Sequence, residues 1–283
     1  MIGEKSEKKI LAYLEEIGDV DAIERRRSSG GTGQGLLGFG KDYWDATGML
    51  LGYIAPDAPG SNLPVVEATA LEPDTRLRNK RVKISLDGFR VHCYPGLGKH
   101  KILCEFTAKN QIKDDPEEVK SVISTEAADR SNASVMGTPI FLGVCVGENG
   151  IAFEGRTVNV SSSGDAEMMS LLDTQTLKSG ITLLTTAQPA IKPFVGLVTA
   201  VLKSLLNRSQ NKEIHKFKLG LDFEKSRTSA CLRLGSFLVI QGSPKNWSWE
   251  HVLWNAETRT LIKKSDHLPV EFNYLVLNVA KFT

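Results

Sequence analysis

Apolar residues near the start of the chain recur with the period of an α-helix. Over residues 4–18, glutamates and lysines separate them, so the sequence predicts a helix with one apolar and one charged face. The run from Arg25 to Gly35 is basic and then rich in glycine and serine, which is typical of a flexible linker. We therefore expect residues 1–47 to form a helical arm and a linker that are separable from the remainder. The apolar face of the helix would consist of Ile10, Leu11, Leu14 and Ile17.

From about residue 63 the pattern changes to short segments that alternate between apolar and polar residues, separated by Gly, Pro, Asn and Asp. This alternation is typical of strands with one buried face. The clearest pair, 89–94 and 101–106, flanks a Pro-Gly turn and predicts a hairpin. The segments 139–146 and 271–282 are apolar on both faces, which indicates central strands. We predict a mainly β fold, an antiparallel β-sandwich of about ten strands, over residues 63–283.

One segment inside this region has a helical pattern instead. Asp165 can cap a short helix, and after Pro193 apolar residues recur at helical spacing. We therefore predict a helical insertion near residues 165–207. The stretch 181–206 is the most apolar part of the chain, but prolines and lysines interrupt it, so it cannot span a bilayer. We expect a helix packed in the core, with burial in a membrane interface after release as the alternative.

The composition is that of an ordinary globular protein. The 283 residues include 35 lysines and arginines and 33 aspartates and glutamates, a net charge of +2, so we expect no nucleic-acid partner. The four cysteines form no C-x-x-C pair and the five histidines show no ligand spacing, so we expect neither a metal nor a disulfide framework. The chain begins with charged residues and lacks a stretch of roughly 18 apolar residues. We expect a cytoplasmic protein without a cofactor.

Signatures of catalysis are missing or stand in the wrong context. Residues 33–38 fit G-x-G-x-x-G without a preceding strand, and residues 35–41 fit G-x-x-x-x-G-K, but Asp42 stands where a hydroxyl should bind magnesium. No G-x-S-x-G sequence occurs. We predict a protein that is not an enzyme. The enzymatic alternative would use four residues of the predicted hairpin: His92, Cys93, His100 and Glu105.

Two groups of residues are candidate binding surfaces. Five cations, the basic cluster, could contact phosphate, anionic lipid or an acidic partner, although we favour an edge strand that its charge protects from pairing. Trp247 and Trp249 would share one face of a strand and could stack on a partner, although packing in the core or at the rim of the sandwich is the more common fate of such tryptophans. The basic cluster consists of Arg76, Arg78, Lys80, Arg81 and Lys83.

These observations favour a non-enzymatic module that binds another protein. The helix at 4–18 would act as a detachable docking or regulatory arm, because an amphipathic helix can bind in an apolar groove. The alternative is an effector that becomes active on an anionic membrane once a protease cuts at Arg25, Arg26 and Arg27 and the 181–206 segment is released. No known family is indicated by these motifs.

Overall fold

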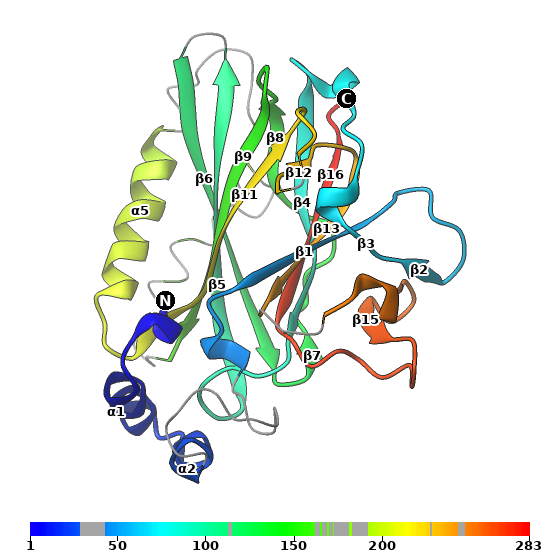
Figure 1. Ribbon diagram of the computed structural model, residues 1–283. Helices are drawn as coiled ribbons and strands as arrows, with labels where there is room; N and C mark the ends of the chain where they lie inside the picture. Colours follow the sequence, from blue (N-terminus) through cyan, green and yellow to red (C-terminus); the bar gives the residue numbers. More distant parts are fainter. Residues whose placement is uncertain are drawn as a thin grey trace.

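The structure is a computed structural model (Figure 1). Residues 29–42, which include the glycine-rich part of the predicted linker and the two motifs at 33–41, lie outside the residues that it describes. The described residues are 1–28, 43–112, 115–161, 165, 169, 172, 181–182, 192–226, 228–242 and 247–283.

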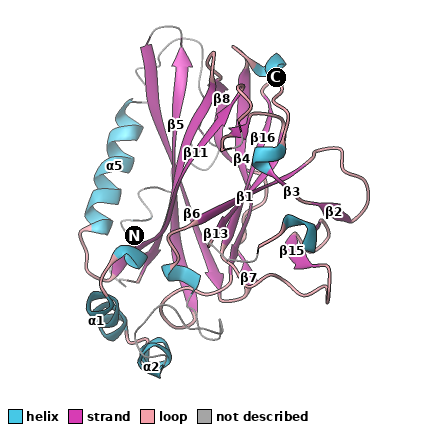
Figure 2. Ribbon diagram, in the orientation of Figure 1, coloured by secondary structure: helices cyan, strands magenta, loops and turns pink. Residues whose placement is uncertain are grey.

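The fold is mainly β, as predicted, with strands that are almost all antiparallel (Figure 2). The described strands form three open sheets, so the single sandwich of about ten strands is not confirmed. The eight-stranded sheet has the order β10-β8-β4-β16-β13-β1-β3, with β7 beside β4; the five-stranded sheet has the order β12-β11-β9-β5-β6; and the three-stranded sheet has the order β15-β14-β2. Their bounds are β1 (Met49–Ile54), β2 (Asn62–Pro64), β3 (Val66–Glu67), β4 (Arg81–Val91), β5 (Lys99–Ile112), β6 (Asp115–Ala128), β7 (Ser131–Asn132), β8 (Thr138–Cys145), β9 (Gly150–Val160), β10 (Ile181–Thr182), β11 (Asn211–Asp222), β12 (Ala230–Cys231), β13 (Gly235–Gln241), β14 (Val252–Asn255), β15 (Thr260–Lys263) and β16 (Tyr274–Lys281).

The central strands β13 and β16 of the eight-stranded sheet are buried on both faces. On β13, Phe237 and Val239 belong to the main core, while Leu238 and Ile240 belong to a second core under the three-stranded sheet. Successive side chains of a strand point to opposite faces, so an uninterrupted apolar run is what such a strand requires. The same alternation on β16 explains why residues 271–282 are apolar on both faces.

The predicted hairpin is wrong. β4 pairs with β16, β8 and β7, whereas β5 pairs with β6 and β9, so the turn at 95–98 connects two different sheets. The two sheets contact through Phe141 of β8 and Phe153 of β9, whose ring centroids are 6.3 Å apart. Turn residues signal a change of direction, but they do not determine which strands pair.

The N-terminal helices pack against the body of the protein (Figure 1). The predicted helix forms as α1 (Glu7–Ile17), and a second helix that we did not predict, α2 (Val20–Ser28), contains the basic triplet Arg25, Arg26 and Arg27. The expectation that this triplet belongs to a flexible linker is therefore wrong. Asp19 caps α2 by accepting a hydrogen bond from the Ala22 N–H (3.0 Å), and it also accepts one from the N–H of Gly96 (2.7 Å) in the turn before β5.

The helical insertion is confirmed where the structure describes it. Helix α5 (Lys192–Leu206) lies beside the five-stranded sheet (Figure 1), with Val198, Val201, Leu202 and Leu205 buried. This arrangement is the core helix that we favoured. Among the residues that the structure describes, none of the helices has the length and apolar content of a transmembrane span. The short 3₁₀ helices are η1 (Ile2–Glu4), η2 (Tyr43–Asp45), η3 (Ala68–Ala70), η4 (Thr75–Leu77) and η6 (Trp249–His251).

Candidate binding pocket

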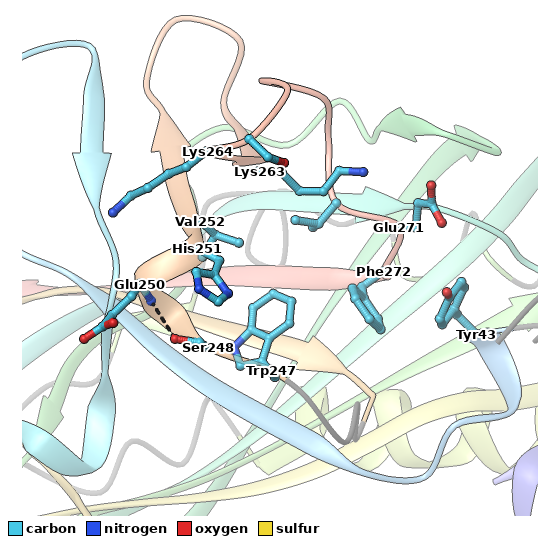
Figure 3. A pocket seen from close by; sticks show the side chains of 12 residues that line it. Tyr43, Trp247, Ser248, Glu250, His251, Val252, Lys263, Lys264, Glu271 and Phe272 are labelled. Atoms are coloured by element: carbon cyan, nitrogen blue, oxygen red, sulfur yellow. Dashed lines mark hydrogen bonds between the residues drawn. The ribbon is translucent and has the colours of Figure 1, made fainter. Parts of the chain in front are cut away.

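A pocket of about 620 Å³ opens beside the three-stranded sheet (Figure 3). It is lined by one residue of η2, by the segment around η6 and the start of β14, and by the end of β15 with the chain that leads to β16. Its size is within the usual range for ligand pockets. We call it the aromatic pocket, and its lining residues are Tyr43, Trp247, Ser248, Glu250, His251, Val252, Lys263, Lys264, Ser265, Val270, Glu271 and Phe272.

Three aromatic rings form its walls. Phe272 stands between the other two, with its ring centroid 4.8 Å from that of Tyr43 and 5.6 Å from that of Trp247. Both pairs meet edge to face, at interplanar angles of 63° and 89°, which is a preferred geometry for aromatic side chains. Rings held in this way turn different faces and edges toward the pocket.

Trp249 supports the wall from behind. Its ring is 5.1 Å from the Trp247 ring and lies against β1 at Gly52, where a Cβ atom would be only 2.5 Å from the Trp249 ring. A glycine at this position therefore permits the indole to lie on the sheet. The two tryptophans are in contact, but the prediction that they share one face of a strand is wrong, because they occupy η6 and the segment before it.

A buried amide pair holds Tyr43 and Phe272 in place. The Gln241 Nε2 donates hydrogen bonds to the backbone carbonyls of Trp44 (2.9 Å) and Ala46 (2.9 Å), which follow Tyr43. The Asn273 Nδ2, next to Phe272, donates to the Gln241 Oε1 (3.2 Å). Buried amides that satisfy one another fix the surrounding backbone, so the two sides of the pocket share one rigid support.

The lining of the pocket carries charges of both signs, from two glutamates and two lysines. Glu271 lies beside Phe272 and Tyr43, and it has no ion-pair partner among the described residues. Lys263 is 3.4 Å from Asp266, while Glu250 and Lys264 extend away from the rings (Figure 3). Burial raises the pKa of the Tyr43 hydroxyl; the charge of Glu271 adds to this effect, and the charge of Lys263 opposes it. The phenol is therefore neutral at pH 7.

The apolar face of α1 is not available to a partner in this structure. Ile10 and Leu14 are 4% and 0% exposed, and Leu11 and Ile17 pack against the same core. We expected this face to dock on another protein, but it docks on the chain's own β body. An amphipathic pattern shows that a face must be covered, not what covers it.

The basic cluster does not lie on an edge strand. Because β4 lies between β8 and β16, our preferred interpretation of Arg81 and Lys83 is wrong. Arg76 pairs with Asp74 (2.7 Å), and Arg78 pairs with Glu148 (3.6 Å). The carboxylates of Asp74 and Glu148 lie outside the segment 76–83, so the sequence of this segment alone indicated a purely cationic surface.

The four residues of the enzymatic alternative have other partners. The Cys93 Sγ donates to the backbone carbonyl of Tyr94 (4.0 Å). His100 Nε2 is 2.9 Å from the Asp129 carboxylate, and Glu105 pairs with Arg156. The ring of His92 packs edge to face on Tyr43 at 5.6 Å. These contacts do not assemble a nucleophile with its base. No group of three or more metal-binding side chains occurs in the described part of the chain.

No family model matches this chain, and no curated protein or solved structure is significantly similar to it.

Proposed function

We propose that the protein is a non-enzymatic module that binds another protein, and that the aromatic pocket anchors side chains of this partner. The observation that carries the proposal is the set of three rings, Tyr43, Trp247 and Phe272, in an open pocket with charged residues at its rim. Interfaces between proteins concentrate their binding energy in such aromatic centres, surrounded by a polar rim.

The rigid support of the pocket favours binding. Gln241 and Asn273 fix two walls through buried hydrogen bonds, so little ordering is needed when a partner binds. Truncation of an aromatic anchor in such a site typically costs about 2 kcal/mol or more, which is roughly thirtyfold in affinity.

We also propose that the N-terminal helices regulate this pocket, in place of the detachable docking arm. Arg26 of α2 pairs with Glu7 (2.9 Å) and with Asp45, and Asp45 belongs to the same 3₁₀ helix as Tyr43. A shift of α2 would therefore be transmitted to one wall of the pocket. Binding at the pocket and the position of α2 are coupled through this contact.

Affinity capture from the native host tests the proposal, with tagged full-length protein and the Phe272→Ala variant. Leu97→Ala is the matched control, because Leu97 is a large apolar residue, 70% exposed, that does not line the aromatic pocket. We expect a stoichiometric protein partner with wild type and Leu97→Ala, and its loss with Phe272→Ala. A partner retained by a folded Phe272→Ala variant, or no stoichiometric partner for the wild type, would refute the proposal.

A further inference from the structure

We infer that the partner binds as an extended segment that adds a strand to the eight-stranded sheet, beside Met49–Leu51 of β1. This inference rests on the proposed function, because it names the form of the partner segment whose side chains reach the aromatic pocket. The observation that carries it is a short stretch of strand edge whose main-chain groups have no partner among the described residues.

Only one edge of β1 is fully paired. Strand β13 pairs with β1 along its whole length. On the other edge β3 pairs only with Gly52 and Tyr53, because the chain after Glu67 forms the 3₁₀ helix η3. In the described part of the chain, Met49–Leu51 therefore has no hydrogen-bonded strand on that side. We call this stretch the open edge.

The direction of its main-chain groups follows from the ladder. The Gly242 N–H donates to the Gly48 carbonyl (3.0 Å), whereas the Gln241 N–H donates the other way, to the segment before β16 (2.9 Å). Gly48 thus faces β13, and the main-chain groups of successive residues in a strand point to opposite edges. The N–H and C=O groups of Met49 and Leu51 therefore point to the open edge, where no described residue is hydrogen-bonded to them. Such groups are a template for an added strand.

The open edge is accessible. Met49 is 36% exposed, Leu51 is half-buried, and Glu67, at which β3 ends, is exposed. A peptide main chain carries donors and acceptors at the spacing that this edge presents. The open edge is only three residues long, which suits one extended segment better than the broader contact between two folded copies of the chain.

An added strand would place alternate side chains on the side of the sheet that carries the aromatic pocket. Leu50 packs against the second core together with Trp247, Trp249 and Phe272, so these side chains share one face of the sheet. Trp249 lies directly on β1, at Gly52. The residue of the added strand opposite Leu50 points to this same face. Main-chain hydrogen bonds would then provide affinity, and the aromatic rings would select the side chain.

Peptides selected on the protein test the inference. We would select linear peptides from a displayed library of random sequences on the full-length protein, and then methylate their main-chain nitrogens one at a time. In an added strand every second N–H bonds to β1. We expect methylation to weaken binding about fivefold or more at these positions and to have little effect at the residues between them.

A proline variant locates the binding edge. Met49→Pro removes an N–H that points away from β13, and proline is tolerated at the first residue of a strand. We expect it to weaken peptide binding at least about fivefold. Met49→Leu is the matched control, because it keeps the N–H and an apolar side chain, and it should bind like the wild type. Circular dichroism and urea unfolding show whether both variants are folded.

Hydrogen exchange of the wild type gives a readout that does not depend on these variants. The amides of Met49 and Leu51 should exchange quickly in the free protein and become protected when a selected peptide binds. The inference would be overturned by protection of both amides in the free protein, by a failure to select peptides with the alternating methylation pattern, or by equal peptide binding to folded Met49→Pro.

These results separate the inference from the proposed function. If no peptide adds to the open edge while Phe272→Ala still loses its protein partner, the strand addition is wrong and the anchoring role of the pocket stands. If peptides add to the open edge while Phe272→Ala keeps its partner, the edge is a strand-binding site and the proposed anchoring role is wrong.

Discussion

The guanidinium of Arg26 lies 4.9 Å from the centroid of the Trp44 ring. Trp44 is fully buried, and its backbone carbonyl accepts a hydrogen bond from Gln241. The contact therefore joins helix α2 to the polar network that supports Tyr43 in the aromatic pocket. It also explains why the basic triplet is part of a docked helix rather than a linker.

Removal of this contact should affect both stability and binding. We expect Arg26→Ala to lower the free energy of unfolding by about 1–2 kcal/mol and to reduce binding of the protein partner proposed for the aromatic pocket. Arg27→Ala is the matched control, because Arg27 is 64% exposed and pairs with the exposed Glu15 (3.1 Å), and it should change stability by less than about 0.5 kcal/mol. Urea unfolding and affinity capture of the partner measure the two effects. Similar losses in both variants would show that Arg26 has no special role.

Gly52 should be intolerant of a side chain. Its Cβ would lie 2.5 Å from the Trp249 ring, so Gly52→Ala must displace the indole or β1. We expect a loss of about 1–3 kcal/mol and altered near-ultraviolet circular dichroism from the tryptophans. Gly220→Ala on β11 is the control, because a Cβ there meets nothing within 4 Å. Equal stability of the two variants would contradict the packing of Trp249.

Buried His215 should make the protein sensitive to mild acid. Burial lowers its pKa from 6.5 to about 4, and its Nε2 has no hydrogen-bond partner among the described residues. Between pH 6.5 and 4 the unfolded chain binds a proton at His215 that the folded chain does not bind. The contribution of this residue to the free energy of unfolding is therefore fully present above pH 6.5 and decreases as the pH falls. The slope should be about 1.4 kcal/mol per pH unit, or about 3 kcal/mol in all.

Unfolding of wild type and His215→Leu across this pH range checks the prediction. The variant removes the group that titrates, so the difference between the two unfolding free energies should change by about 3 kcal/mol between pH 7 and pH 4. A constant difference would show that His215 does not control the acid response. Other groups that titrate in this range cancel in the comparison.

Asp19 should contribute to the docking of the N-terminal helices. Its two carboxylate oxygens accept from the N–H groups of Ala22 (3.0 Å) and Gly96 (2.7 Å). Asp19→Ala leaves both donors without this partner, and we expect a loss of about 1–2 kcal/mol. Asp19→Asn keeps one oxygen acceptor and should lose less. Denaturant midpoints with unchanged m-values would report these differences, and a neutral Asp19→Ala variant would contradict them.

Local patterns were sufficient to predict the elements whose form depends on near neighbours in sequence. Helix α1 follows from the spacing of Ile10 and Leu14, and the buried side of α5 follows from Val198 and Leu205. The apolar run in β16 correctly indicated a strand buried on both faces. These predictions succeed because burial of a face requires a repeating pattern in the side chains.

The pairing of the strands and the docking of helix α1 could not be predicted from such patterns. The alternation in β5 fits β4 or β6 equally well, and only the packing of the two large sheets selects β6 and β9. The apolar side chain of Leu14 must be buried. The sequence of the helix does not show whether the chain's own sheet or a partner protein buries it. The hydrogen bond from Gly96 to Asp19 comes from a part of the chain that no local pattern connects to α1.

The sequence by itself determined the mainly β fold, the first helix, the buried helix α5 and the presence of neighbouring tryptophans. Only the tertiary structure decided that Tyr43, Trp247 and Phe272 meet around one pocket, with Glu271 beside them. The physical reason is that these residues come from three separate segments, which the Gln241 and Asn273 hydrogen bonds and the packing of the small sheet bring together. Such long-range contacts depend on the whole fold, and no periodicity within a single segment encodes them.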